Sequence, residues 1–134
     1  MGRPKVDWRG QVGMDVGERR QRSELEASVQ ARVREALEAV GVRVERNNIG
    51  AIQKGRRFIR YGVFGKGGPD LFCFLHGGIV FFVETKRAKG GEITPEQREC
   101  IAGLRAMGFV AGLARSPEEA IELWNEARGA RRAA

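Results

Sequence analysis

Two neighbouring segments that are dense in Phe, Val, Ile and Leu constrain the fold more than any other feature of the sequence. They span residues 70–75 and 79–86, and Gly77-Gly78 lies between them. A short glycine turn between two apolar runs predicts a β-hairpin. Because apolar residues occupy both faces of each strand, we expect these strands at the centre of a sheet that is covered on two sides.

Helical spacing of apolar residues predicts three helices around this hairpin. Each begins at a residue suited to an N-cap, namely Ser23, Thr94 or Ser116. Alternating or short apolar runs predict the remaining strands. The helices are expected at 23–40, 94–107 and 116–127, and the further strands at 42–45, 49–52, 58–63 and 109–113. This order predicts an α/β fold with a central mixed β-sheet flanked by helices.

The chain of 134 residues has the size of one domain. We expect a flexible basic arm at 1–22, a folded domain at 23–127 and a basic tail at 128–134. The longest apolar run, 79–83, is far shorter than the roughly 20 residues that cross a bilayer. The N-terminus is polar and basic and lacks the apolar segment of a secretory signal. We therefore expect a cytoplasmic protein with no membrane partner.

The charge balance and the scarcity of metal-binding side chains narrow the possible functions. With 24 Lys and Arg against 17 Asp and Glu, the formal net charge is +7, and such a domain attracts polyanions, most often nucleic acid. Cys73 and Cys100 are the only cysteines, and His76 is the only histidine. A tetrahedral zinc site and every mechanism that needs a histidine base are therefore excluded. The two thiols lie in apolar patterns and are expected to be reduced, as in a cytosol.

Charged residues lie at the open end of the predicted hairpin. If Leu75 faces Ile79 across a three-residue turn, Asp70 lies directly opposite Glu84, and the two side chains share a face. Lys86, two residues beyond Glu84, projects from that same face. A two-residue turn would instead place Asp70 opposite the residue after Glu84, so the prediction requires the three-residue turn, a bulge, or a bend at Asp70.

Two carboxylates brought together destabilise a fold unless a cation lies between them. A pair of oxygen ligands suits Mg²⁺ or Mn²⁺, and the Thr85 carbonyl is placed to be a third ligand. A metal held in this way can bind a phosphate oxygen and lower the pKa of a bound water. Lys86 can hold or activate the attacking water, or neutralise the phosphate. This combination predicts phosphodiester hydrolysis.

These residues resemble the PD-(D/E)XK nuclease superfamily, and the longer pattern resembles the VRR-NUC (virus-type replication-repair nuclease) domain. The resemblance covers about residues 23–115. It rests on the acidic start of the first helix, Arg46-Asn47-Asn48, Gly68-Pro69-Asp70-Leu71, Phe82-Val83-Glu84-Thr85-Lys86, Gly91 and Glu96-Gln97. It implies a restriction-endonuclease-like core and a metal-dependent DNA nuclease. Its stand-alone members, in phages and bacteria, resemble homodimers that cut branched DNA such as four-way (Holliday) junctions.

The VRR-NUC resemblance also implies roles for individual residues. The catalytic set is Asp70, Glu84, Lys86 and Gln97, and the metal ligands are Glu26, Asp70, Glu84 and the backbone of Thr85. Glu26 and Gln97 represent a glutamate on the first helix and a glutamine on the helix after the motif, with Glu24 as the alternative to Glu26. Thr85 stands where valine is more usual, a change that leaves its carbonyl in place.

Each of these residues also has an ordinary structural interpretation. Glu26 and Gln97 can each complete a capping box with the N-cap residue three positions earlier. Asp70 can be a turn residue after the preceding proline. Glu84 and Lys86 can form an exposed ion pair worth under about 1 kcal/mol.

Seven basic residues are expected to contact DNA phosphates on either side of the site, with a solvated surface as the alternative. Four gather around the predicted strands 49–52 and 58–63, and three flank the site: Lys54, Arg56, Arg57 and Arg60, then Lys66, Arg87 and Lys89. No aromatic platform for base stacking and no recognition helix is evident, so recognition through backbone and shape is expected. The glycine-rich loop at 65–68 precedes neither Gly-Lys-Ser/Thr nor a helix, which excludes a nucleotide cofactor site of that type.

These features predict a Mg²⁺- or Mn²⁺-dependent endonuclease that cuts branched DNA in phage or bacterial replication or repair. A homodimer is expected because cutting two symmetric strands requires two sites. The alternative is a non-catalytic DNA-binding module, or a structural subunit of a replication or repair complex, that keeps the nuclease fold.

Overall fold

The computed structural model describes residues 16–132, in which one helix precedes five strands, and a helix, a strand and a helix follow. The elements are α1 (Val16–Ala39), β1 (Arg43–Arg46), β2 (Gly50–Lys54), β3 (Arg57–Tyr61), β4 (Leu71–Leu75), β5 (Ile79–Thr85), α2 (Pro95–Ala106), β6 (Val110–Ala114) and α3 (Pro117–Arg132). This is the order that the sequence predicts. In this part of the chain, no helix is both long and apolar enough to cross a membrane.

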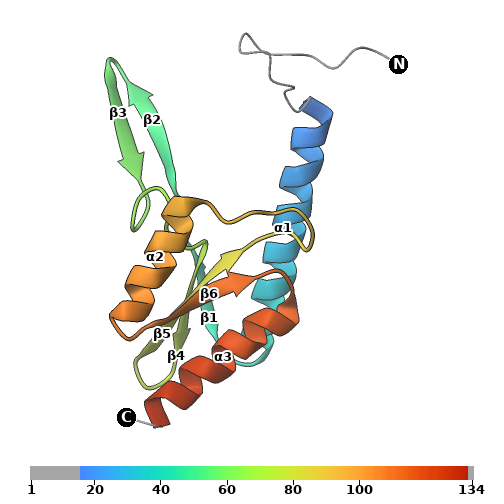
Figure 1. Cartoon of the computed structure of the whole chain (residues 1–134), viewed down its shortest axis with the longest axis vertical. Helices are drawn as coiled ribbons and strands as arrows, with labels where there is room; N and C mark the ends of the chain where they lie inside the picture. Colours follow the sequence, from blue (N-terminus) through green and yellow to red (C-terminus); the bar gives the residue numbers. More distant parts are fainter. Residues whose placement is uncertain (1–15, 133–134) are drawn as a thin grey trace.

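A four-stranded mixed sheet forms the centre of the domain, in the order β1-β4-β5-β6. β4 pairs antiparallel with β1 and with β5, whereas β5 and β6 run parallel. The two apolar strands of the predicted hairpin are thus the central ones, as expected. β2 and β3 pair only with each other and form a separate hairpin that extends away from the main sheet (Figure 1).

The alternation of side chains along β5 produces two apolar layers. Phe81 and Val83 pack in the larger core with residues from α1 and α3, such as Leu37 and Leu123. Phe82 points to the opposite face and packs against Leu104 of α2. Successive strand residues alternate between faces, so the apolar run 79–83 of β5 requires helices on both sides of the sheet. This arrangement confirms the predicted fold class.

The first helix begins earlier than predicted. α1 starts at Val16, so Ser23 lies inside the helix and is not its N-cap, and Glu26 is not part of a capping box. Residues 18–22 read Glu-Arg-Arg-Gln-Arg, all good helix formers, which extend the helix past Ser23. Residues 16–22 therefore belong to α1 and not to a flexible arm, while 1–15 lie outside the described residues.

The starts of the other two helices agree with prediction. The Thr94 hydroxyl caps α2, and the Ser116 hydroxyl accepts a 3.2 Å hydrogen bond from the backbone N–H of Glu119 in the first turn of α3. α3 extends to Arg132, beyond the predicted end at 127, and the Arg128 guanidinium lies 3.6 Å from the centre of the Trp124 ring. Most of the predicted tail is therefore helical, and residues 133–134 lie outside the described part.

The burial of the two thiols predicts how each one reacts with a thiol reagent. Cys73 is 0% exposed, and burial raises its pKa to about 12. Cys100 is only partly buried, and its pKa is also raised, first by burial and then by Glu84. Because the thiolate is the reactive form, we expect a thiol reagent to modify Cys100 in the folded protein and Cys73 only after denaturation. Peptide mass spectrometry with and without denaturant tests this, and equal labelling of both thiols in the folded protein would contradict it.

Candidate active site

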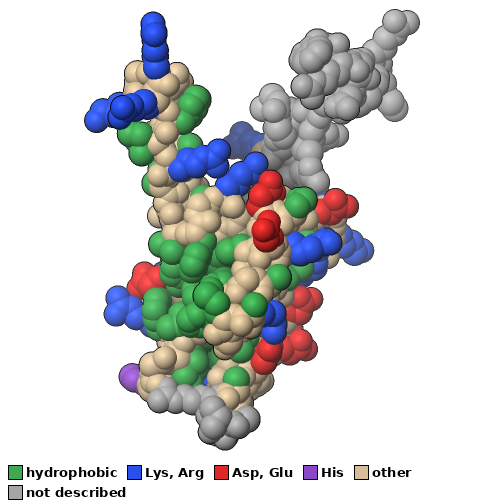
Figure 2. Space-filling view, turned by 60° about the vertical axis from the view of Figure 1, so that its left-hand side comes forward, with side chains coloured by type: hydrophobic (Ala, Val, Ile, Leu, Met, Phe, Trp, Pro, Cys, Tyr) green, Lys and Arg blue, Asp and Glu red, His purple; other side chains and the backbone are tan. Residues whose placement is uncertain are grey.

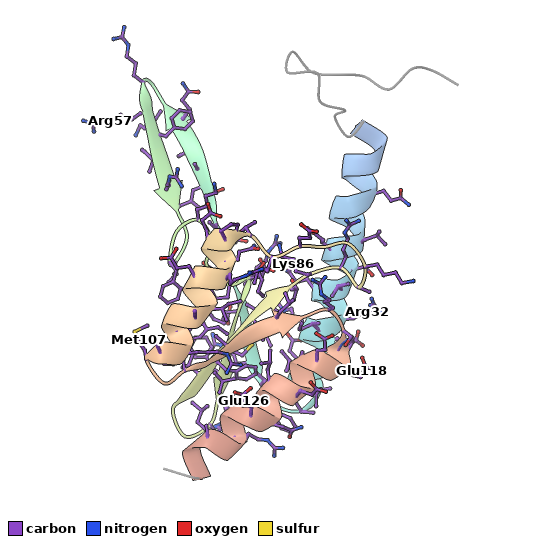
Figure 3. All side chains as sticks on the ribbon, viewed as in Figure 1. Arg32, Arg57, Lys86, Met107, Glu118 and Glu126 are labelled. Carbon is purple, nitrogen blue, oxygen red and sulfur yellow. The ribbon has the colours of Figure 1, made fainter. Side chains whose placement is uncertain are left out.

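A pocket of about 300 Å³ lies where β5 ends, between α1 and the start of α2. Its lining combines all the predicted catalytic and metal-binding residues with three others: Glu26, Ala27, Gln30, Arg46, Asp70, Glu84, Thr85, Lys86 and Gln97. Figure 3 shows Lys86 in this region, near the first turn of α2. Residues far apart in the sequence thus meet at one end of the central sheet.

The hairpin has the predicted three-residue turn, and Asp70 reaches the pocket through a bend, which was one of the expected alternatives. Leu75 pairs with Ile79 across a three-residue turn, as expected, but the ladder ends at the pair Leu71–Val83. Asp70 lies in a bend just before β4, so it is not a strand partner of Glu84. Its Oδ2 instead accepts hydrogen bonds from the Thr85 N–H at 3.0 Å and the Thr85 hydroxyl at 2.7 Å. The bend turns the carboxylate into the pocket.

Asn47 holds the loop that delivers Asp70. Its backbone N–H donates a 2.7 Å hydrogen bond to the Asp70 carbonyl. Its side-chain amide donates to the Pro69 and Val63 carbonyls at 3.1 and 2.9 Å, and its Oδ1 accepts from the Val63 N–H at 3.0 Å. Four hydrogen bonds on one residue therefore fix both ends of the loop.

The same loop packs against the first turn of α2. At Gly67 the backbone has φ +104°, and a Cβ atom there would lie 2.7 Å from the Glu96 carbonyl. Only glycine fits this approach. Gly67 therefore lets the loop meet the start of the helix that carries Gln97.

Glu84 is the most constrained group in the pocket. The residue is 2% exposed. Its Oε1 accepts a 2.8 Å hydrogen bond from Gln97 and lies 3.7 Å from the Lys86 ammonium. Its Oε2 is buried and has no hydrogen-bond partner. Burial, and then the nearby Asp70, raises the pKa of Glu84 to about 8, against a smaller lowering by Lys86.

Gln97 completes the capping box of α2 and also contacts Glu84, whereas its catalytic role stays a prediction. The side-chain Oε1 of Gln97 accepts a 3.0 Å hydrogen bond from the backbone N–H of Thr94. The backbone N–H of Gln97 donates a 3.1 Å hydrogen bond to the Thr94 hydroxyl, so the capping box is complete. Its Nε2 remains free to donate to Glu84. The capping box thus fixes the side chain that reaches the carboxylate.

Lys86 and Glu84 do not form the exposed pair that was the alternative interpretation. Their side chains are 11% and 2% exposed. The Lys86 backbone N–H donates a 3.1 Å hydrogen bond to the Ala114 carbonyl, which continues the contact between β5 and β6 beyond the last strand residue. The ammonium is therefore held inside the pocket.

The donor set fits a divalent cation with open coordination positions. A buried carboxylate oxygen without a partner is costly, and a hard cation would satisfy Glu84 Oε2. Among the described residues, however, no group of three or more His, Cys, Asp or Glu side chains gathers closely enough to hold a metal by itself. Glu26 lines the pocket as an exposed residue, and the Glu24 side chain is not described. The arrangement suits an ion such as Mg²⁺, which keeps several waters.

Three features of the pocket were missed by sequence reasoning. Gln30 lies one helical turn after Glu26, and this i, i+4 spacing was the signal that could have found it. It donates to the Thr85 hydroxyl over 3.5 Å. Arg46 lines the pocket but was noted only as part of a motif. The Thr85 side chain was given no role, yet its hydroxyl holds Asp70.

The seven residues predicted to contact DNA separate into two groups. Lys54, Arg56, Arg57 and Arg60 are exposed on the β2–β3 hairpin, and Figure 2 shows Lys and Arg side chains at its free end. Lys66 lies 3.8 Å from Glu96, the Arg87 guanidinium donates to the Gly90 carbonyl at 2.9 Å, and Lys89 is exposed. Their contacts with DNA stay predictions.

Comparison with known proteins supports the fold. No family model and no curated protein matches the chain. The chain is similar to a solved structure described as a VRR_NUC domain, with 25% sequence identity, a TM-score of 0.55, and coverage of 75% of this chain and 95% of that one. The chain therefore has a nuclease-domain fold. Within that class, it adopts the fold of the VRR-NUC domain, and the predicted resemblance is confirmed.

The raised pKa of Glu84 predicts how metal-free stability depends on pH. In the folded protein this carboxyl keeps its proton up to about pH 8, whereas its ordinary pKa is 4.5. Unfolding therefore releases a proton between these values, and the contribution of Glu84 to stability is present below about pH 4.5 and lost as pH rises through about 8. We expect Glu84→Gln to flatten this decline. Thermal unfolding in chelator across this pH range tests it, and parallel curves for the two proteins would contradict it.

Proposed function

We propose that this protein is a Mg²⁺- or Mn²⁺-dependent endonuclease that hydrolyses DNA phosphodiester bonds. The observation that carries the proposal is the buried, unpartnered Glu84 Oε2 in a pocket that Asp70 and Lys86 also line. The nuclease-domain fold supports DNA as the substrate. The chain that forms this pocket has a formal net charge of +7. This positive charge favours binding of a polyanion.

Asp70 and Glu84 are the proposed metal ligands, with the Thr85 carbonyl and Glu26 as further oxygen donors. A bound divalent cation supplies Lewis-acid stabilisation of phosphate charge and lowers the pKa of a coordinated water. The protein supplies the orientation. Thr85 holds Asp70 through two hydrogen bonds, and Gln97 holds Glu84 through one.

Lys86 is the proposed catalytic cation. Its ammonium lies 3.7 Å from Glu84 Oε1 and is largely shielded from solvent, where a charge acts more strongly than in water. From this position, Nζ can donate to a phosphate oxygen as negative charge builds up, or orient the attacking water. Gln97 acts as a positioning residue, because its amide is committed to both Glu84 and the capping box.

The finer substrate assignment rests on the VRR-NUC resemblance together with the surface. We propose branched DNA, such as a four-way junction, cut by a homodimer in the cytoplasm of a bacterial or phage-infected cell. The exposed basic β2–β3 hairpin supports contact with the DNA backbone through shape.

Replacing Lys86 tests the assignment of the catalytic cation. We expect Lys86→Ala to lower the cleavage rate of a labelled four-way junction by about 10²- to 10³-fold, because one donor to developing charge is lost. Binding of the junction in chelator should change little. The matched control is Arg43→Ala, which removes an exposed cation paired with Glu45 at 2.9 Å, away from the pocket.

The same cleavage experiment is repeated with Mg²⁺, with Mn²⁺ and with chelator. Cleavage should require Mg²⁺ or Mn²⁺ and stop with chelator. Wild-type cleavage by Lys86→Ala would refute its role. If the unchanged protein binds the junction but no metal stimulates cleavage, the chain is a non-catalytic DNA-binding module.

Replacing Thr85 tests whether its hydroxyl positions Asp70. Thr85→Val keeps the shape and the backbone hydrogen bond but removes the 2.7 Å contact with Oδ2. Loss of a group that orients a metal ligand typically lowers metal affinity about 10- to 100-fold, and we expect a decrease of that size in Mn²⁺ affinity by titration calorimetry. Thr85→Ser keeps the hydroxyl and should bind nearly as the unchanged protein does. Equal affinity for the valine and serine variants would argue against this role.

A further inference from the structure

A second hollow of about 480 Å³ adjoins the candidate active site. Its lining runs from the active-site pocket to the base of the β2–β3 hairpin: Gln30, Arg46, Asn47, Asn48, Ile49, Tyr61 and Asp70. Gln30, Arg46 and Asp70 also line the active-site pocket. The two hollows therefore share one wall. A polymeric ligand bound at Asp70 can continue directly into the second hollow.

Arg46 provides a cation at the junction of the two hollows. It is the last residue of β1, and its side chain is exposed. Within the described part of the chain, no hydrogen bond or ion pair engages its guanidinium. An exposed guanidinium with no carboxylate partner is suited to bind a phosphate through paired N–H donors.

Tyr61 provides an aromatic surface in the same hollow. It is the last residue of β3, pairs with Gly50 of β2, and is 48% exposed. A Cβ atom at Gly50 would lie 2.3 Å from the Tyr61 hydroxyl oxygen and 2.5 Å from the ring carbon that bears it. The ring thus rests on the Gly50 backbone, in space that any other residue would occupy. This support holds the ring in place while about half of the side chain remains open.

We propose that the second hollow binds the nucleotide next to the scissile phosphate, with Arg46 on a backbone phosphate and Tyr61 stacked on the base. The proposal rests on the proposed nuclease function, because Asp70 belongs to both hollows. A base can stack on a protein ring only if it leaves the duplex stack. Among branched DNAs, the preferred substrate is therefore one with an unpaired nucleotide beside the cleavage position.

The charge around the hollow favours DNA over a protein partner. Residues 47–69, which include the hairpin, contain five Lys and Arg and no Asp or Glu. The hairpin also exposes apolar side chains, and Ile52 and Ile59 are 53% and 43% exposed, so a second copy of the chain is the competing occupant. A segment whose charged residues are all basic would repel the same segment of a second chain, whereas it attracts the phosphate backbone of DNA.

The sequence predicted no stacking platform because Tyr61 occurs in an ordinary strand pattern. A strand in the main sheet would bury much of such a ring. The β2–β3 pair lies outside that sheet, so the ring stays accessible.

Binding measured without cleavage tests the proposal. Fluorescence anisotropy in chelator compares a labelled duplex with the same duplex carrying a short unpaired gap. We expect the unchanged protein to prefer the gapped DNA, and Tyr61→Ala to weaken gapped-DNA binding by about tenfold, the scale of one stacked base, with little effect on the intact duplex. Tyr61→Phe keeps the ring and should keep the preference.

Two further variants separate stacking from charge and from general exposure. Arg46→Ala should weaken binding to gapped DNA and reduce the slope of log affinity against log salt by about 1, whereas Tyr61→Ala should leave that slope unchanged. The matched control is Phe58→Ala. Phe58 is 72% exposed, and strand alternation places it on the hairpin face opposite Tyr61, so its loss should not change the preference.

The outcomes distinguish this proposal from its alternatives. A gap preference that survives Tyr61→Ala, or that disappears in Phe58→Ala, overturns the subsite. So does a Tyr61→Ala variant with altered molar mass by light scattering but unchanged DNA preference, because the face is then an interface between copies. If Tyr61→Ala lowers the melting temperature, the test rests on the other two variants. Tyr61→Phe must then keep the gap preference, and Arg46→Ala must weaken binding to gapped DNA. Metal-dependent cleavage without any gap preference refutes the subsite alone, and gap preference without cleavage refutes the proposed nuclease function alone.

Discussion

A buried carboxylate at the end of the central strand is the constraint on which the rest of the site depends. Glu84 is 2% exposed, and one of its oxygens has no hydrogen-bond partner. An interior tolerates such a group only when it is neutral or paired. Gln97 and Lys86 both address Oε1, so Oε2 remains unsatisfied while the raised pKa of Glu84 keeps the group protonated to about pH 8. A cation at this position would satisfy Oε2, and the proposed phosphodiester hydrolysis would use the same cation.

The sheet explains how residues from three layers meet at that carboxylate. Successive residues of β5 point to opposite faces. Glu84 therefore reaches Gln97 at the start of α2, whereas Thr85 reaches Gln30 on α1. Asp70 completes the site because it leaves the ladder just before β4 and turns toward Thr85. A strand end at which one helix covers each face thus gathers polar side chains from both layers, and two of them, Glu84 and Thr85, are buried.

Local patterns predicted the fold and most of the pocket, because the relevant signals lie close together in the chain. The three-residue turn determines the pairing of Leu75 with Ile79, and the spacing of Thr94 and Gln97 predicts the capping box that orients the amide. Features that depend on distant contacts could not be decided from the sequence. The bend at Asp70 follows from hydrogen bonds made by Asn47, and the exposure of Tyr61 follows from the position of its hairpin outside the main sheet.

The β2–β3 hairpin is an isolated element whose charges bear on the proposed contact with DNA. A two-stranded hairpin is marginally stable alone, and the free end of this one places Lys54 directly opposite Arg57, a like-charge pair that destabilises a ladder. Figure 2 shows Lys and Arg side chains at the free end of the hairpin, with no Asp or Glu side chain beside them on the face in view. A polyanion would remove the repulsion, whereas an apolar partner would bury it. The central sheet therefore carries the candidate chemistry, and the basic end of the hairpin suits the proposed contact with a phosphate backbone.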